Sequence, residues 1–374
     1  MSVGALIREL RSTLGWSQGR LASALCEASQ HATVTREDVS RWEHGKRRPG
    51  PFWMRHLATV LQVPLETLER ADVHRRDFVK SVAATLIAPI VASDLIEAGF
   101  AAALTNRHLT PDQWRARIAR YGRDYMSLGA AEMQQRLTAD LVVLQQQLEE
   151  PELWAVASRL MTLYGKTIPG TDGSKAVQWY RMAATAADRS GDDASRVWVR
   201  GRAAIALGYE GACLPVAESF ANQALAISDR PSLGMLNAVM SKAHIAAIRG
   251  DECAALRLLQ QGRRVFDVAG SEEQQSDFAI PEWRMAVFAS LLLARLGDER
   301  AAVVEQEVAI RNLPASLPRF ATHIDLHRAL MLARAGDRAG GVAYSREALR
   351  KLPPERHSLT LRMLLAEIEA VPAQ

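Results

Sequence analysis

The sequence predicts an all-α protein in which a small N-terminal helical domain is followed by a long array of paired helices. Apolar residues recur every three or four positions through most of the chain, and almost no segment alternates with the period of two that is typical of strands. Gly and Pro gather in short clusters that indicate turns between helices. The 374 residues suit two or three domains, and we expect these to comprise residues 1–70, 71–107 and 108–374.

Composition excludes several classes of protein. Apolar residues make up 48% of the chain and charged residues 24%, which is ordinary for a folded globular protein. Cys26, Cys213 and Cys253 form no Cys-x-x-Cys pair, which argues against a disulfide framework or a structural zinc site and indicates a reducing cytosol. No apolar run reaches the roughly 18 residues that a membrane span needs. We therefore expect a cytoplasmic protein with no membrane partner, no metal and no cofactor.

The basic charge of the chain lies in its first fifth. Residues 1–80 hold 13 Lys and Arg against 9 Asp and Glu, a net charge of +4, whereas the remaining 294 residues hold 33 of each. A local positive field of this kind favours a polyanionic partner, most simply nucleic acid. A solvated basic face would have a similar composition.

Residues 1–70 are expected to form about five short helices around a recognisable motif. Gly15-Trp16-Ser17-Gln18 opens one helix, and Val39-Ser40-Arg41-Trp42-Glu43 is followed by the basic loop Gly45-Lys46-Arg47-Arg48. With Ile7, Arg11 and the Leu57–Leu68 segment, this pattern resembles the Cro/CI-type, or XRE-family, helix-turn-helix domain. The resemblance covers about 65 residues, and it implies an ion pair between Arg11 and Glu43 and a DNA-binding function. The alternative is a repressor-like fold used for protein contacts.

The motif predicts which side chains would reach DNA. Ser17 and Thr35 are good helix N-caps, and Asp38 follows Thr35 at the position of a capping-box partner. In a helix-turn-helix the second helix lies in the major groove, where Arg can bond guanine and Glu can accept from cytosine. Residues at the start of the preceding helix and in the exit loop would contact phosphates. The predicted DNA-binding residues are Ser17, Gln18, Thr35, Arg36, Glu37, Ser40, Arg41, Lys46, Arg47 and Arg48.

One stretch departs from the family pattern. Cys26 to Val34, between the two helices of the motif, is about seven residues longer than the usual tight turn. These residues extend the first of the two helices, form a loop over DNA, or alter the docking angle. The sequence leaves the three alternatives open.

Residues 71–107 are interpreted as a linker with one apolar helix. His74-Arg75-Arg76-Asp77-Phe78-Val79-Lys80 and the apolar run after it are similar to a twin-arginine export signal. An export signal belongs at the N-terminus, however, and here a complete DNA-binding motif precedes it. We favour a linker whose helix packs on the following domain. An alternative role for Arg75 and Arg76 is contact with DNA phosphates that flank the binding site.

Residues 108–374 repeat a short pattern. Gly250-Asp251, Gly297-Asp298 and Gly336-Asp337 each follow an apolar helix and precede an amphipathic one. Small residues also recur at the spacing Ala176-x3-Tyr180-x2-Ala183 and again from Ala217 to Ala224, which lets neighbouring helices approach closely. The region resembles the tetratricopeptide repeat, which implies a right-handed α-superhelix with a concave surface. An unrelated helical bundle is the alternative.

The combined architecture is similar to bacterial peptide-pheromone receptors that join this DNA-binding type to a repeat domain. This resemblance implies a peptide in the concave groove. Because a single DNA-binding module makes a small interface, we also expect a homodimer contacted through the repeats or the 81–104 helix. Residues assigned to the inner face can hold a peptide backbone or carboxylate. These candidates are Arg202, Asn237, His244, Arg284 and His323. The alternatives are ordinary packing roles, a small-molecule ligand, or no ligand.

The sequence therefore predicts a transcriptional regulator that binds double-stranded operator DNA. No Gly-rich phosphate loop or nucleophile elbow is found, so we do not expect an enzyme. His323 and His327 lie one helical turn apart, but no third ligand accompanies them, and metal binding is not expected. The composition, rich in Ala, Arg and Trp, is typical of a high-GC bacterium such as an actinomycete. The competing hypothesis is an adaptor protein whose repeats recruit a partner and whose DNA binding is incidental.

Overall fold

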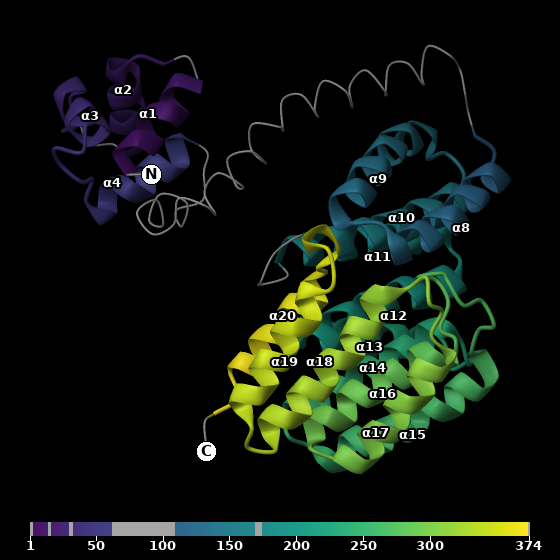
Figure 1. Ribbon diagram of the computed structural model, residues 1–374. Helices are drawn as coiled ribbons and strands as arrows, with labels where there is room; N and C mark the ends of the chain where they lie inside the picture. Colours follow the sequence, from purple (N-terminus) through teal and green to yellow (C-terminus); the bar gives the residue numbers. More distant parts are fainter. Residues whose placement is uncertain (1–2, 14–15, 30–32, 62–108, 169–173, 373–374) are drawn as a thin grey trace. The chain divides into compact units, whose positions relative to one another are not determined.

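The architecture is taken from a computed structural model, which describes residues 3–13, 16–29, 33–61, 109–168 and 174–372. Contacts divide the chain into two units, Met1–Asp94 and Leu95–Gln374, and each is treated separately below (Figure 1). Every regular element in the described ranges is a helix, which confirms the predicted all-α class. Within these ranges, no helix combines the length and apolar character required to cross a membrane.

The N-terminal unit contains four described helices around one small core. They are α1 (Val3–Thr13), α2 (Gln18–Ser29), α3 (Arg36–Glu43) and α4 (Pro51–Val60). The core is formed by apolar side chains spaced three or four apart on each helix, including Ile7, Leu21, Leu25, Val39, Trp42 and Leu57. The predicted fifth helix and the domain boundaries at 70 and 107 lie outside the described residues, as does the predicted linker.

The long connection after the first helix of the motif is partly helical. α2 continues to Ser29, so the sequence extends this helix by one turn beyond Cys26. The Cys26 thiol donates to the Val34 carbonyl at 3.4 Å, and Val34 is buried in the core. The first of the three alternatives for this stretch is therefore confirmed in part.

The second unit, called the repeat unit here, comprises the described residues 109–168 and 174–372. Its helices are α8 (Pro111–Ser127), α9 (Ala130–Leu144), α10 (Pro151–Thr167), α11 (Ser174–Ser190), α12 (Asp193–Glu210), α13 (Leu214–Ile227), α14 (Leu233–Ile248), α15 (Glu252–Ala269), α16 (Glu282–Leu296), α17 (Glu299–Asn312), α18 (Pro318–Arg334), α19 (Arg338–Arg350) and α20 (Leu359–Glu369), with short 3₁₀ turns at Gln145–Gln147 and Pro354–Arg356. From α10 to α19, consecutive helices form pairs that stack on the next pair. This is the predicted tetratricopeptide-like architecture.

The repeated Gly-Asp pairs form the turns inside these helix pairs. Gly250, Gly297 and Gly336 adopt φ values of 77°, 81° and 103°, a left-handed conformation that favours glycine. Asp251 and Asp298, like Asp337, then cap the next helix, and their carboxylates accept from backbone N–H groups at 2.8–3.0 Å. The turn pattern read from the sequence is confirmed.

Close helix packing depends on small residues. Ala183, Ala217, Ala221 and Ala224 are fully buried, as their spacing predicts. The α12 and α14 backbones approach so closely at Gly201 that an added Cβ would lie 2.0 Å from the Gly234 carbonyl oxygen. These contacts hold the inner helices in register.

The inner helices are covered on all sides. α12 is buried without interruption over 197–209, and α16 over 283–295, whereas α13, α15 and α17 each bury one face. Part of the cover comes from α20, which packs against α18, α19 and α12 (Figure 1). The space between the inner helices contains a small, partly open cavity.

Candidate nucleic-acid interface and ligand cavity

The sequence holds α3 at its start through a reciprocal cap. The Thr35 hydroxyl accepts from the Asp38 amide at 3.3 Å, and the Asp38 carboxylate accepts from the Thr35 amide at 3.2 Å. This hydrogen bond from the Thr35 backbone is the main cause that lowers the pKa of Asp38. The predicted capping box is confirmed, and it fixes the first turn of α3. At the start of α2, Ser17 forms a one-way cap, in which its hydroxyl accepts from the Arg20 amide at 3.1 Å.

α3 has one buried face and one charged, exposed face. Val39 and Trp42 are buried in the core, whereas Arg36, Glu37 and Arg41 are exposed. Asp38 lies between two arginines, 3.9 Å from Arg41 Nη1 and 3.8 Å from Arg47 Nη1. The side chains of Arg41 and Arg47 remain 58% and 67% exposed, so both are accessible to a ligand.

Glu43, at the end of α3, ties three helices together. Its side chain is fully buried and accepts from Arg11 Nε at 2.6 Å and Arg11 Nη2 at 3.1 Å. The amide of Gln18 donates to the same carboxylate at 2.8 Å. Burial by itself raises the pKa of Glu43, but the hydrogen bonds from Arg11 and Gln18 outweigh it, so this pKa is lowered. The orientation of α3 against α1 and α2 is thus set by one buried carboxylate.

The loop after α3 is basic and exposed. Lys46, Arg47 and Arg48 follow Gly45, whose φ of 69° turns the chain away from the helix. Three consecutive cations in one exposed loop are suited to phosphate contacts. The start of α2, α3 and this loop carry all of the predicted DNA-binding residues.

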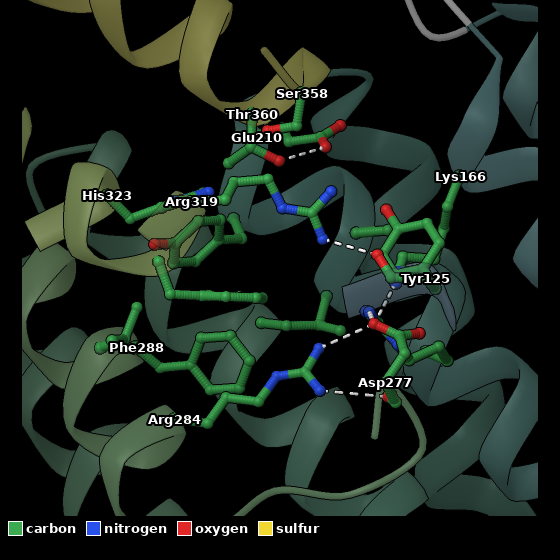
Figure 2. Close-up of a pocket in the computed structure, with 16 residues that line it drawn as sticks. Tyr125, Lys166, Glu210, Asp277, Arg284, Phe288, Arg319, His323, Ser358 and Thr360 are labelled. Atoms are coloured by element: carbon green, nitrogen blue, oxygen red, sulfur yellow. Dashed lines mark hydrogen bonds and ion pairs between the residues drawn. The ribbon is translucent and has the colours of Figure 1, made fainter. Parts of the chain in front are cut away.

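The repeat unit contains a cavity of about 80 Å³ between its inner helices. Figure 2 shows Arg319 and Arg284 reaching across it toward Tyr125 and Asp277, with Glu210 on a third side. The wall is assembled from α8, α10, α12, α16 and α18, the 270–281 loop and the start of α20. No local segment of the sequence forms it.

Asp277 is the electrostatic centre of the cavity. Its Oδ1 atom lies 2.5 Å from Lys166 Nζ, 2.9 Å from Arg202 Nη2 and 3.0 Å from Arg284 Nη2. The Asp277 amide donates to the Gly122 carbonyl at 2.8 Å, which anchors the 270–281 loop on α8. Arg284 also donates to backbone carbonyls of that loop, so it has a structural role as well.

Burial and charge shift the titration of these groups in different directions. Burial by itself raises the pKa of Asp277, but the charges of Arg202, Lys166 and Arg284 hold it well below its usual range. Burial, followed by repulsion from Arg202, lowers the pKa of Lys166 well below its usual value. Burial raises the pKa of Glu210 to about 7, although the Thr360 hydroxyl donates to its carboxylate at 2.8 Å. Burial thus disfavours the charged forms of Lys166 and Glu210, whereas the neighbouring cations keep Asp277 ionised.

Residues 2–71 match a family model described as a helix-turn-helix domain. The N-terminal unit is a helix-turn-helix domain. Among solved structures, the chain is similar to Bacillus thuringiensis PlcR in complex with the peptide PapR7 and DNA, with 18% identity, 71% of this chain and 95% of that chain covered, and a TM-score of 0.36. No curated protein matches the chain.

Within the helix-turn-helix domain, the predicted ion pair and both predicted caps are present. The Gln18 side chain, expected at a phosphate, is instead bonded to Glu43 in the free domain. Its contact with DNA, like those of the other predicted residues, stays a prediction.

The five predicted ligand residues separate into two groups. Arg202, Arg284 and His323 line the cavity, whereas Asn237 and His244 are buried elsewhere on α14. His244 Nδ1 lies 3.3 Å from Arg295 Nη1, and its ring packs on Tyr209, which lines the cavity, with centroids 5.0 Å apart. The role of each in ligand binding stays a prediction.

Sequence reasoning missed the other charged residues of the wall. These are Lys166, Glu210, Asp277 and Arg319, which lie on four different elements. Asp277 meets Lys166 and Arg202 across 111 and 75 residues of sequence, so no spacing rule connects them. The one local signal is that Asp277 precedes the apolar run Phe278–Pro281, which is unusual for an exposed loop.

The two histidines with metal-like spacing are used in packing. His327 Nε2 lies 3.1 Å from the Tyr209 hydroxyl, and Nδ1 lies 3.0 Å from Ser290 Oγ. His323 stacks on Phe320 with ring centroids 5.6 Å apart. In the described part of the chain, no group of three potential ligands is arranged to hold a metal ion.

Proposed function

We propose that the protein is a sequence-specific DNA-binding transcriptional regulator whose repeat unit dimerises and senses a ligand. The observation that carries the proposal is the state of α3, which is capped by Thr35 and Asp38, anchored by Glu43 and exposed at Arg36, Glu37 and Arg41. A helix held in this way on a small domain is suited to insertion in the major groove. Such a regulator works in the cytoplasm, where operator DNA lies.

In this proposal, different charged residues contact the bases and the phosphates. Arg41 lies at the exposed end of α3 and can bond guanine O6 and N7 bidentately, while Glu37 can accept from cytosine N4. Lys46, Arg47 and Arg48 would bind phosphates and set the register of the domain on the duplex. Asp38 holds Arg41 and Arg47 within 4 Å, which limits their freedom before binding.

Dimerisation follows from the size of the domain. One module of about 60 residues makes a small interface, and pairing two modules across half-sites is the usual remedy. The repeat unit supplies the larger surface for such pairing, and its cavity is the proposed place for a ligand that alters the dimer.

Affinity selection tests the function directly. Full-length protein is incubated with sheared genomic DNA near physiological ionic strength, and the retained fragments are sequenced. Enrichment of one inverted repeat supports a dimeric operator reader. Retention without a shared motif, lost as salt rises, contradicts sequence-specific binding and favours an adaptor protein with incidental DNA binding.

Two variants then test the assignment of residues. Arg41→Ala is expected to cost about 1–3 kcal/mol and to relax one base position, whereas Arg47→Ala weakens binding to all sequences alike and flattens the salt dependence. Arg257→Ala, an exposed arginine of the repeat unit, is the matched control and should bind like the wild type. If Arg41→Ala keeps the wild-type sequence preference, the assignment of α3 residues to bases is wrong.

A further inference from the structure

The cavity of the repeat unit is lined by more buried basic side chains than acidic ones. Four basic side chains face it, and each is at most 8% exposed to solvent: Lys166, Arg202, Arg284 and Arg319. Among the described lining residues, the acids are Asp277 and Glu210. Uncompensated charge in a low-dielectric interior is unfavourable, so a cavity with this balance needs an anion to complete it.

Asp277 does not neutralise the group. One oxygen of its carboxylate serves three cations, while its other oxygen has no hydrogen-bond partner among the described residues. Arg202 Nε and His323 Nδ1 are also buried without a partner in the described part of the chain. Buried polar atoms are normally satisfied by a protein group, a ligand or water. The unpaired Arg202 Nε–H is a donor that suits an anion, whereas Asp277 Oδ2 is an acceptor and requires a donor.

Glu210 does not carry a full negative charge at neutral pH. Its carboxyl group is bonded by the Thr360 hydroxyl, and burial raises its pKa to about 7. Arg319 is held by a different contact, donating to the Tyr125 carbonyl at 2.8 Å, and its guanidinium stands over the Tyr125 ring at 5.2 Å. The positive charge of Arg319 is therefore not paired with either acid of the wall by an ion pair.

The cavity adjoins a larger space that can hold the rest of a ligand. A second pocket of about 470 Å³ shares Tyr125, Lys166, Glu210 and Arg319 with it and extends along α9 and α20. Ligand pockets usually have volumes of about 300–1,000 Å³. The volume of about 80 Å³ in the inner cavity suits a single compact group instead.

We infer that the inner cavity binds an oxyanion, the carboxylate or phosphate group of a small ligand, between Lys166, Arg202, Arg284 and Arg319. The planar guanidinium groups match the oxygen geometry of either anion. Lys166 supplies a compact amine donor, whose protonated form a bound anion would favour. The larger pocket then receives the body of the ligand. This inference rests on the proposed ligand-sensing function and names the chemistry of its signal.

Calorimetry of the full-length protein tests the inference with two probes, inorganic phosphate and malonate. Sodium chloride at matched ionic strength is the control for general screening. Saturable binding of phosphate alone assigns the group to a phosphate, and saturable binding of malonate alone assigns it to a carboxylate. Binding of neither probe above the chloride control overturns the inference.

Variants establish where the anion binds. Lys166→Met removes one cation with little change of shape and leaves Asp277 paired with Arg202 and Arg284, so we expect affinity to fall at least about tenfold. Lys351→Met, on the exposed end of α19, is the matched control and should bind like the wild type. Arg319→Gln is the second variant, because its amide can still donate to the Tyr125 carbonyl. Circular dichroism verifies folding, and unchanged affinity in a folded variant places the anion elsewhere and contradicts the inference.

The operator selection is run on the same protein samples. Anion binding without operator enrichment overturns the proposed regulator and leaves the cavity chemistry intact. Operator enrichment without anion binding supports the proposed regulator and overturns the inference about the cavity.

Discussion

Removing the Glu43 carboxylate should loosen the whole helix-turn-helix domain. Glu43→Ala deletes three hydrogen bonds, two from Arg11 and one from Gln18. Breaking a buried ion pair by removing one partner costs about 3–5 kcal/mol. Arg11 is 13% exposed and keeps its bond to the Trp16 carbonyl, so we expect the lower end of that range, about 3 kcal/mol.

Hydrogen exchange of the full-length protein measures this effect locally. Amides of α1 and α3 should exchange roughly 100-fold faster in Glu43→Ala, since each 1.4 kcal/mol is a factor of ten. Glu27→Ala, an exposed acid on α2, is the control and should change stability by less than about 0.5 kcal/mol.

A double-mutant cycle separates the ion pair from other effects of the substitution. With Arg11→Met already present, Glu43→Ala should cost clearly less, because the buried cation is gone. An equal cost in both backgrounds would refute the argument, as would unchanged exchange in the single variant.

Three further predictions concern the repeat unit, and thermal unfolding measures each. Gly201→Ala should cost about 1–3 kcal/mol, because the new Cβ meets the Gly234 carbonyl; an unchanged midpoint would mean that α12 and α14 separate freely. Burial lowers the pKa of His323 to about 3 and also lowers the pKa of His327. Below about pH 6.5 the unfolded chain therefore binds protons that the folded chain does not, and the stability of the protein should fall as the pH falls. His327→Phe should weaken this acid sensitivity. Glu210 faces Lys166, Arg202 and Arg362 and has the opposite effect. Because its pKa is raised, the folded state holds a proton that the unfolded chain releases, and the stability gained in this way is lost as the pH rises from about 4.5 through 7. Glu210→Gln should remove that loss.

Local features of this protein follow from its sequence. The capping box at Thr35 and Asp38 and the Gly-Asp turns depend on residues within four positions of one another, so a spacing rule identifies them. The sequence does not determine whether α2 extends to Ser29, because a helix and a loop both suit the composition of that stretch.

The cavity was only partly predictable, because its contacts are distant in sequence. Alignment of the repeats assigns Arg202, Arg284 and His323 to the inner face, and all three line the cavity. The same reasoning selected His244, which the stacking of helix pairs places beside Arg295 instead. Asp277 is positioned by the fold of its loop on α8, which no local pattern encodes.

The position of α20 determines when the cavity can exist. Ser358 and Thr360 form part of its wall, Thr360 bonds Glu210 across 150 residues, and Glu367 pairs with Arg295 of α16 at 2.8 Å. Translation reaches these residues after all other helices of the wall have been made. A nascent chain therefore exposes the arginines of the inner layer to solvent and polyanions until α20 docks. A product truncated before residue 358 would keep the helix-turn-helix domain but would lack part of the cavity wall.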